Sequence, residues 1–167
     1  MSKLCLASLF LYEIIMVSSL LNVYTIAQSL ANRNRMVAIL YRKKNIYSVG
    51  FSSSLTHKQL FNNRLYFPSI HAEVDAITRA FNKYVRINKK PLYCDMLVVR
   101  YVGSSKPCIN CLKMMKNPAF CIRIRNVSYC EDGELKTERL SDIKTDHVSR
   151  GFKYVKHSSA CQYIDLP

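Results

Sequence analysis

The sequence predicts an α/β protein in which helices sandwich a mixed β-sheet. Apolar runs of strand length alternate with segments of helical periodicity, in the order helix, strand, strand, helix, strand, helix, strand, strand. The chain has 167 residues, enough for one domain with its own core. Its hydrophobic content of 49% excludes an intrinsically disordered chain.

Residues 1–31 are predicted to be an apolar N-terminal extension that leads into the first helix, and residues 32–167 the main domain with a polar C-terminal tail. The helix is indicated by apolar residues near i, i+3, i+4 spacing: Val17, Leu20, Leu21, Tyr24, Ala27 and Leu30. A membrane anchor or signal is the alternative, since Glu13 is the one charge in residues 4–31. Met16 is an alternative start of the chain.

The next segments predict a hairpin, a long loop and a helix. Runs 36–41 and 46–50 are apolar or β-branched and flank a polar turn, as in paired strands. Residues 51–70 are polar and irregular, and loops of this length are usually functional or disordered. Residues 71–85 have helical periodicity, and their apolar stripe is expected to pack in the core: Val74, Ile77, Phe81 and Tyr84.

The remaining elements complete the predicted sheet. Residues 95–102 form an apolar strand, and Pro107 is well placed to open a helix over 108–116. Segments 122–130 and 134–140 are predicted strands joined by Asp132-Gly133, a hairpin turn sequence. The last two strands are therefore expected to be antiparallel.

Two predicted helix starts carry metal-binding chemistry. His71 and Glu73 begin one helix, and Pro107 precedes Cys108 and Cys111 in the other. One imidazole and two thiolates suit tetrahedral zinc and leave one coordination position for water. Glu73 is then the candidate catalytic residue, placed to move protons between that water and a substrate. His-x-Glu followed by Pro-Cys-x-x-Cys is the pattern of zinc-dependent nucleobase deaminases.

Other interpretations of these residues are less specific. A redox Cys-x-x-Cys motif also opens a helix but needs no His-x-Glu. A closed structural zinc site would recruit Cys94, Cys121 or His57 as a fourth ligand. The seven cysteines are scattered and odd in number, which argues against a secreted disulfide framework and favours a cytoplasmic protein.

On these motifs the chain resembles the cytidine and deoxycytidylate deaminase family. HAEVDAI (71–77) looks like its first zinc motif and SKPCINCLKMM (105–115) like its second, and the resemblance spans about residues 35–140. It implies a three-layer α-β-α sandwich around a five-stranded mixed sheet, one zinc per subunit and a homo-oligomer. It also implies that His71, Cys108 and Cys111 are ligands and that Glu73 is the proton shuttle. The family's free-cytidine branch usually has Cys where His71 stands.

One loop departs from the family pattern. Family members usually place a sugar-binding Asn after the second strand, whereas this chain has VGFSSSLTHKQ (49–59), with Ser52 or Ser53 at that place. A hydroxyl also hydrogen-bonds a sugar, with shorter reach. The candidate substrate-binding residues are Ser52, Ser53, Thr56, His57 and Ala72.

The sequence thus predicts a hydrolase of C–N bonds: a zinc-dependent deaminase of a cytosine nucleoside or nucleotide that releases ammonia. In the family that the chain resembles, the polynucleotide-acting branches more often insert a helix between the last two strands, so the resemblance implies that the short turn here favours a small substrate. A formal charge of +14 keeps a nucleic-acid partner open, and with it the alternative of an enzyme that edits tRNA or single-stranded nucleic acid. A non-catalytic zinc-binding protein is the third hypothesis.

Overall fold

The computed structural model of the chain describes residues 20–33, 35–53 and 70–149. It contains a helix over residues 20–33 and one five-stranded mixed sheet with strand order β2-β1-β3-β4-β5. The sheet and the helices between its strands comprise β1 (Met36–Arg42), β2 (Asn45–Phe51), α2 (Ala72–Ala80) with a π-helical continuation (Phe81–Val85), α3 (Arg86–Asn88), β3 (Leu92–Arg100), α4 (Ile109–Lys116), a 3₁₀ turn (Pro118–Phe120), β4 (Ile122–Glu131) and β5 (Glu134–Arg139).

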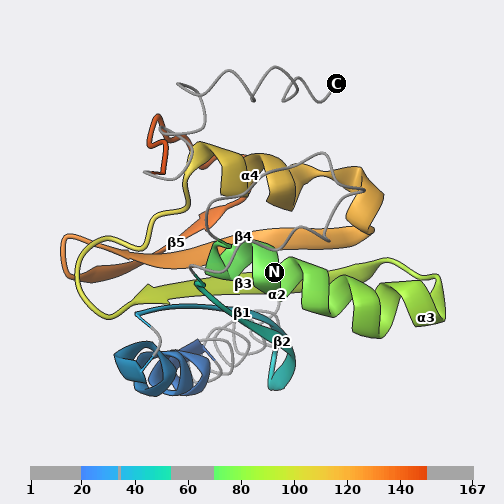
Figure 1. Cartoon of the computed structure of the whole chain (residues 1–167), viewed down its shortest axis with the longest axis horizontal. Coiled ribbons are helices and arrows are strands. Elements are labelled where there is room, and N and C mark those ends of the chain that lie inside the picture. Colours follow the sequence, from blue (N-terminus) through green and yellow to red (C-terminus); the bar gives the residue numbers. More distant parts are fainter. Residues whose placement is uncertain (1–19, 34, 54–69, 150–167) are drawn as a thin grey trace, which may run out of the picture.

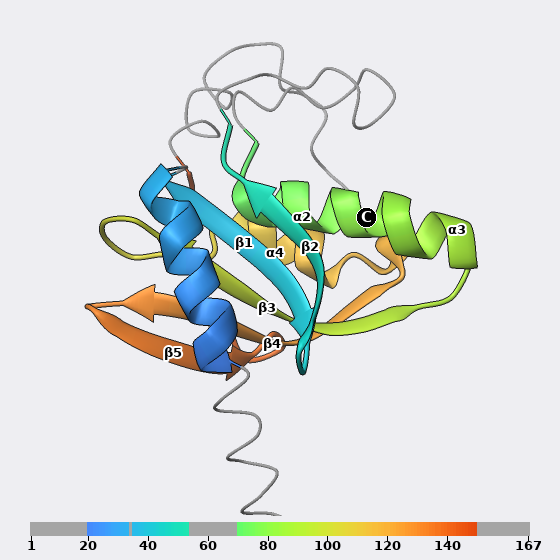
Figure 2. The same ribbon diagram turned by 90° about the horizontal axis from the view of Figure 1, so that it is seen from below.

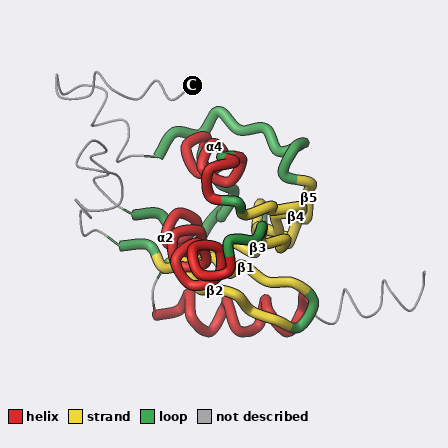
Figure 3. Tube along the Cα trace, turned by 90° about the vertical axis from the view of Figure 1, so that its right-hand side faces the viewer, coloured by secondary structure: helices red, strands yellow, loops and turns green. Residues whose placement is uncertain are grey.

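The described elements form three layers (Figures 1 and 3), as the resemblance implied. Helices α2 and α4 cover one face of the sheet, and the helix of residues 20–33 covers the other. Strands β1 and β2 form the predicted hairpin, and β4 and β5 are antiparallel, also as predicted. Strands β3 and β4 are parallel and are joined through α4.

The strand directions determine where the helices begin. Strands β2 and β3 both run antiparallel to β1, and β4 runs parallel to β3. Strands β2, β3 and β4 therefore end at the same edge of the sheet, and α2 and α4 begin beyond that edge, after β2 and β3 respectively. Loops at the carboxyl ends of parallel strands usually hold the ligand site of an α/β fold.

The larger part of the core lies between the sheet and helices α2 and α4. The apolar stripe predicted for α2 contributes to it: Val74 and Ile77 are buried, and Phe81 and Tyr84 are half-buried. The Phe81 ring meets Phe120 edge-on at 5.6 Å between centroids. The predicted packing role of the stripe is confirmed.

The N-terminal helix faces the sheet with most of the predicted stripe: Ala27 is buried, and Leu20, Tyr24 and Leu30 pack against the same cluster. Leu21 is the exception, since it was expected to be buried but is 61% exposed. Val23 and Ala31 are buried instead, beside Ala27, against Leu97 and Val99 of β3 (Figure 2). The rotation of the helix is set by packing against the sheet, and the residues that it buries there are small: Val23, Ala27 and Ala31. Val17 and most of the 1–31 extension lie outside the described residues.

Two element boundaries differ from the sequence-based expectation. Strand β3 begins at Leu92 rather than at residue 95 and ends at Arg100, so Tyr101 and Val102 project into solvent. The predicted helix over 71–85 changes to π geometry at Phe81 and ends at Asn88. In the described ranges, no helix has both the length and the apolar character needed to cross a membrane.

Candidate metal centre

The candidate ligands sit at the first positions of two helices. His71 is the N-cap of α2 and Cys108 the N-cap of α4, both with extended backbone geometry. Cys111 lies one turn into α4, which brings its sulfur to the same side as that of Cys108. Backbone amides at a helix start favour negatively charged sulfur.

Backbone pairing at the end of β2 positions His71. Ser53 and Ile70 exchange two hydrogen bonds, of 3.0 and 2.9 Å between N and O, and so close the loop between them. The carbonyl of His71 then accepts the Asp75 N–H at 3.0 Å, the first bond of α2. His71 therefore follows directly after a hydrogen-bonded backbone pair and begins a helix, and both features position its imidazole.

A close approach of β2 to α2 holds the same helix start against the sheet. A Cβ added to Gly50 would lie 2.2 Å from the Ala72 carbonyl oxygen and 2.3 Å from the Ala76 nitrogen. Beside it, the buried Ser48 hydroxyl donates to the Ala76 carbonyl at 2.8 Å. Small residues on both sides let the backbones approach this closely.

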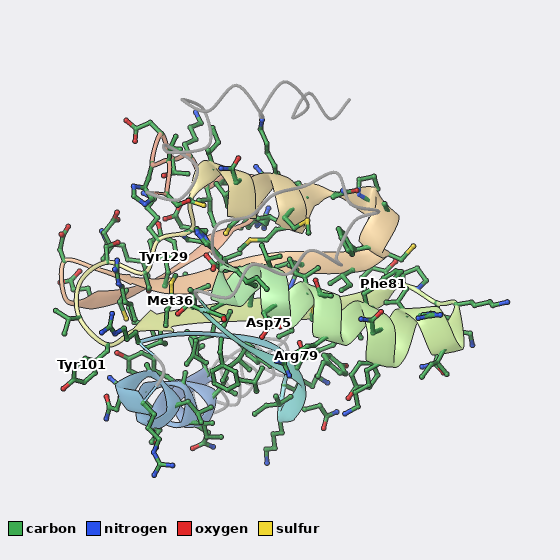
Figure 4. The ribbon with its side chains drawn as sticks, in the orientation of Figure 1. Met36, Asp75, Arg79, Phe81, Tyr101 and Tyr129 are labelled. Atoms are coloured by element: carbon green, nitrogen blue, oxygen red, sulfur yellow. The ribbon has the colours of Figure 1, made fainter. Side chains whose placement is uncertain are left out.

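Asp75 adds a side-chain connection between the same two elements. Its Oδ2 accepts the Phe51 N–H at 3.0 Å, at the end of β2, and the Arg79 Nε–H at 2.9 Å. Figure 4 labels Asp75 and Arg79 one turn apart on α2. Sequence reasoning did not identify this role, since an acidic residue in a first helical turn ordinarily signals only the helix dipole.

A buried serine positions the second motif. Ser105 is fully buried, and its hydroxyl donates to the Val98 carbonyl at 2.8 Å and accepts the Cys130 N–H at 2.7 Å. Its own N–H donates to the Cys130 carbonyl at 2.8 Å. The loop before Cys108 is thus tied to both β3 and β4. Ser105 is the first residue of the second motif, but the sequence does not reveal its hydrogen bonds to Val98 and Cys130.

The three candidate ligands converge. Their donor atoms all lie within 4.8 Å of one another. His71 Nδ1 is 3.2 Å from Cys111 Sγ and 3.6 Å from Cys108 Sγ. For tetrahedral zinc, with bonds near 2.0–2.1 Å to nitrogen and 2.3 Å to sulfur, the expected nitrogen–sulfur separation is about 3.6 Å. The donor types and their spacing therefore fit a zinc ion with little adjustment.

The pKa values of the two sulfurs are shifted in opposite directions. A hydrogen bond from Cys111 lowers the pKa of Cys108 to about 4, against the effect of burial and with help from His71. The same hydrogen bond, together with burial, raises the pKa of Cys111 well above its ordinary value. Burial lowers the pKa of His71, but the Cys108 hydrogen bond and the Glu73 charge outweigh it, so the net pKa is raised.

Glu73 lies beside this cluster, close enough to His71 and Cys111 for these groups to lower the pKa of its carboxyl against the effect of burial. Only 1% of the residue is exposed, and neither carboxyl oxygen has a hydrogen-bond partner among the described residues. Burial raises the pKa of Glu73, while the nearby His71 charge lowers it. Leaving a buried carboxyl unpaired is costly, so the group is one that a ligand at this site would satisfy.

The residues considered as a fourth ligand are not part of the cluster where they can be placed. Among the described residues, the metal-binding group contains His71, Cys108 and Cys111 alone, without Cys94 or Cys121. Burial raises the pKa of Cys94 to about 12, which keeps it a thiol. His57 lies outside the described residues.

The candidate substrate-binding residues are only partly placed. Ser53 pairs with Ile70, directly before His71, and Ser52 donates its N–H to the Met36 carbonyl at 3.2 Å. Ala72 is fully buried under β2. Thr56 and His57 lie outside the described residues. Binding of substrate by any of these five stays a prediction.

Fold and site together define an α/β protein that carries a His/Cys/Cys metal-binding cluster between two helix N-termini. The model of the cytidine and deoxycytidylate deaminase zinc-binding region matches residues 17–131, most of the chain, and the protein belongs to this family. Among curated proteins, none matches the chain significantly.

Proposed function

We propose that this protein is a zinc-dependent hydrolase that deaminates a cytosine nucleoside or nucleotide and releases ammonia. The observation that carries the proposal is the unpaired, buried carboxyl of Glu73 next to the His71–Cys108–Cys111 cluster. A purely structural metal site needs no such group. A catalytic metal site with an open coordination position needs an acid–base group beside it.

In this proposal the chain's own residues bind the metal and move protons. His71 Nδ1 and the sulfurs of Cys108 and Cys111 would hold zinc, which would supply a Lewis acid able to activate water near neutral pH. Glu73 would take one proton from the attacking water and pass it to the ring nitrogen N3, then take the second from the hydroxyl formed at C4 and pass it to the departing amine. Oxygen replaces nitrogen at C4 of cytosine, the C–N bond breaks, and ammonia leaves.

The raised pKa of Glu73 suits this role. Burial brings the pKa of the carboxyl closer to neutrality, where an acid–base group exchanges protons most effectively. The tight β4–β5 turn at Asp132-Gly133 supports a small substrate, as argued from the sequence.

The direct test is ammonia release by zinc-loaded protein from cytidine, dCMP, adenosine and a short single-stranded oligonucleotide. Release from cytidine or dCMP is the expected result. Release from the oligonucleotide alone would favour the nucleic-acid-editing alternative. No release from any of the four would favour a non-catalytic zinc protein.

Exchanging Glu73 for glutamine tests its role. Glu73→Gln keeps the shape and burial of the side chain but removes proton transfer, which typically contributes 10²–10⁴-fold to rate. We expect kcat to fall at least about 100-fold with zinc content unchanged by elemental analysis. Cys111→Ser is the matched comparison, and it should lose zinc as well as activity. A Glu73→Gln variant that turns over at the wild-type rate would refute the assignment.

A further inference from the structure

One end of the molecule, away from the metal centre, carries a group of basic side chains that form no ion pair with another described residue. Between Asp75 and Glu131 the sequence contains a single acidic residue, Asp95. Asp95 is 3% exposed and pairs with Arg125 at 3.2 Å. Across these 55 intervening positions, exposed anionic charge is thus absent.

The cations of this stretch gather where α2 ends and where β3 and β4 begin. The end of α2, the turn before β3, the end of α4 and the start of β4 supply six exposed cations, here called the basic end: Lys83, Arg86, Lys89, Lys90, Lys116 and Arg123. The four ion pairs between described residues involve none of the six. Figures 1 and 2 show α3 at one extremity of the fold.

Aromatic and apolar groups are interleaved with these cations. Tyr93 is 57% exposed and lies directly opposite Arg123 in the β3–β4 ladder. Ile87 is 71% exposed. A hollow of about 400 Å³ lies next to them, lined by Tyr84, Asn88, Lys90, Pro91 and Leu92. An ordinary solvated basic face has no reason to expose a tyrosine and an isoleucine together.

We propose that the basic end is a docking surface for single-stranded nucleic acid. Spaced cations match a phosphate backbone, and an exposed tyrosine ring offers a stacking surface for a base, the combination that sequence-tolerant single-strand binders use. An anionic membrane would be met by charge and apolar contact alone and gives no role to the amide- and tyrosine-lined hollow. Nucleic acid is therefore the partner that accounts for all of these features.

This surface is separate from the metal centre and does not depend on the proposed deaminase activity. Helix α2 and its continuation run from the residue after His71 to Asn88, a span of about 25 Å at 1.5 Å per residue. A bound strand can therefore occupy the basic end without entering the metal site.

The test is fluorescence anisotropy of a labelled 20-nucleotide single strand with the full chain, at several salt concentrations. The variant Lys83→Gln/Arg86→Gln/Lys90→Gln should bind on the order of 10- to 100-fold more weakly at 0.1 M salt and lower the slope of log K against log salt by about 2, since each phosphate contact contributes about 0.7. The control Arg33→Gln/Arg100→Gln/Lys144→Gln removes the same charge from exposed cations elsewhere and should bind like wild type.

Base stacking is tested separately with two single variants, each at one exposed tyrosine. Tyr93→Ser should weaken binding about tenfold, as loss of one base–aromatic stack does. Tyr101→Ser is the control, because Tyr101 is 62% exposed at the opposite end of β3.

Three outcomes would overturn the proposal. The first is equal weakening by the two triple variants, which would mean that net charge alone drives binding. The second is displacement of the oligonucleotide by saturating dCMP, which would place the strand in the metal site. The third is binding to vesicles containing phosphatidylserine without binding to the oligonucleotide, which would identify a membrane surface.

Discussion

At the scale of single residues, the metal centre depends on how protons and hydrogen bonds are shared among four side chains. His71, Cys108 and Cys111 lie at van der Waals or hydrogen-bonding distance without a metal. Glu73 is buried beside them and has no hydrogen-bond partner in the described part of the chain. A divalent cation bound among these groups would attract the negatively charged sulfur and carboxyl groups. Its binding should therefore stabilise the folded protein against unfolding as well as the site itself.

The protonation of the ligands predicts how zinc affinity depends on pH. The pKa values of Cys111 and His71 are both raised, so each of these groups holds its proton more tightly than a free side chain does. Zinc must displace these protons, so apparent affinity should fall as pH falls, by about tenfold per pH unit for each proton released. Competition with a chromophoric chelator at pH 6, 7 and 8 measures this slope. A pH-independent affinity would contradict the protonation pattern described here.

At the scale of elements, the site depends on contacts that hold two helix starts at the same edge of the sheet. Gly50 brings β2 against α2, and Ser105 ties the loop before α4 to strands β3 and β4. Neither residue is a candidate ligand or catalytic group. Each acts through backbone atoms of other elements of the fold.

Gly50→Ala should separate β2 from α2. The added methyl would meet backbone atoms of Ala72 and Ala76, which cannot rotate away. Overpacking of this kind costs about 1–3 kcal/mol or more in the free energy of unfolding, and zinc affinity should weaken with it. Urea denaturation measures the first effect and chelator competition the second.

Gly103→Asn is the comparison for Gly50→Ala. Gly103 has positive φ, which asparagine tolerates, and open space around its Cα. Its cost should stay near or below about 1 kcal/mol. If the two glycine variants proved equally stable, the close approach at Gly50 would not be a constraint on the fold.

Ser105→Ala should loosen the loop that presents Cys108. The change removes the bond to Val98 and leaves the buried Cys130 N–H without its side-chain acceptor, at a cost of about 1–3 kcal/mol. Zinc affinity should fall together with the free energy of unfolding. Ser104→Ala, at the neighbouring exposed serine, should change neither. A Ser105→Ala protein with wild-type zinc affinity would show that the loop is held by other contacts.

At the scale of the whole molecule, the two ends of helices α2 and α4 carry different chemistry. The carboxyl ends of β2 and β3 lead to the helix starts that hold the metal ligands, and the opposite ends of the helices lead to the basic end. Because α2 connects the two regions as one continuous helical run, their separation is built into the topology. The formal charge of +14 is thus unevenly distributed, which bulk composition alone does not reveal.

The sequence by itself determined the order of the main helices and strands, the two hairpin pairings and the three residues that cluster as candidate metal ligands. These are local properties: periodicity, turn residues and motifs that each begin one helix. Boundaries of β3 and the buried face of the first helix were predicted less well, as Leu92 and Leu21 show.

Only the tertiary structure decided that the two motifs meet, with His71 Nδ1 3.2 Å from Cys111 Sγ. Only the structure shows that contacts of Ser105, Gly50 and Asp75 hold the two motifs in place. Only the structure shows that the cations of α2, α4 and β4 lie at one end of the molecule. The physical reason is that such contacts join residues dozens of positions apart. Their distances depend on strand order and on helix packing against the sheet, which no local pattern encodes.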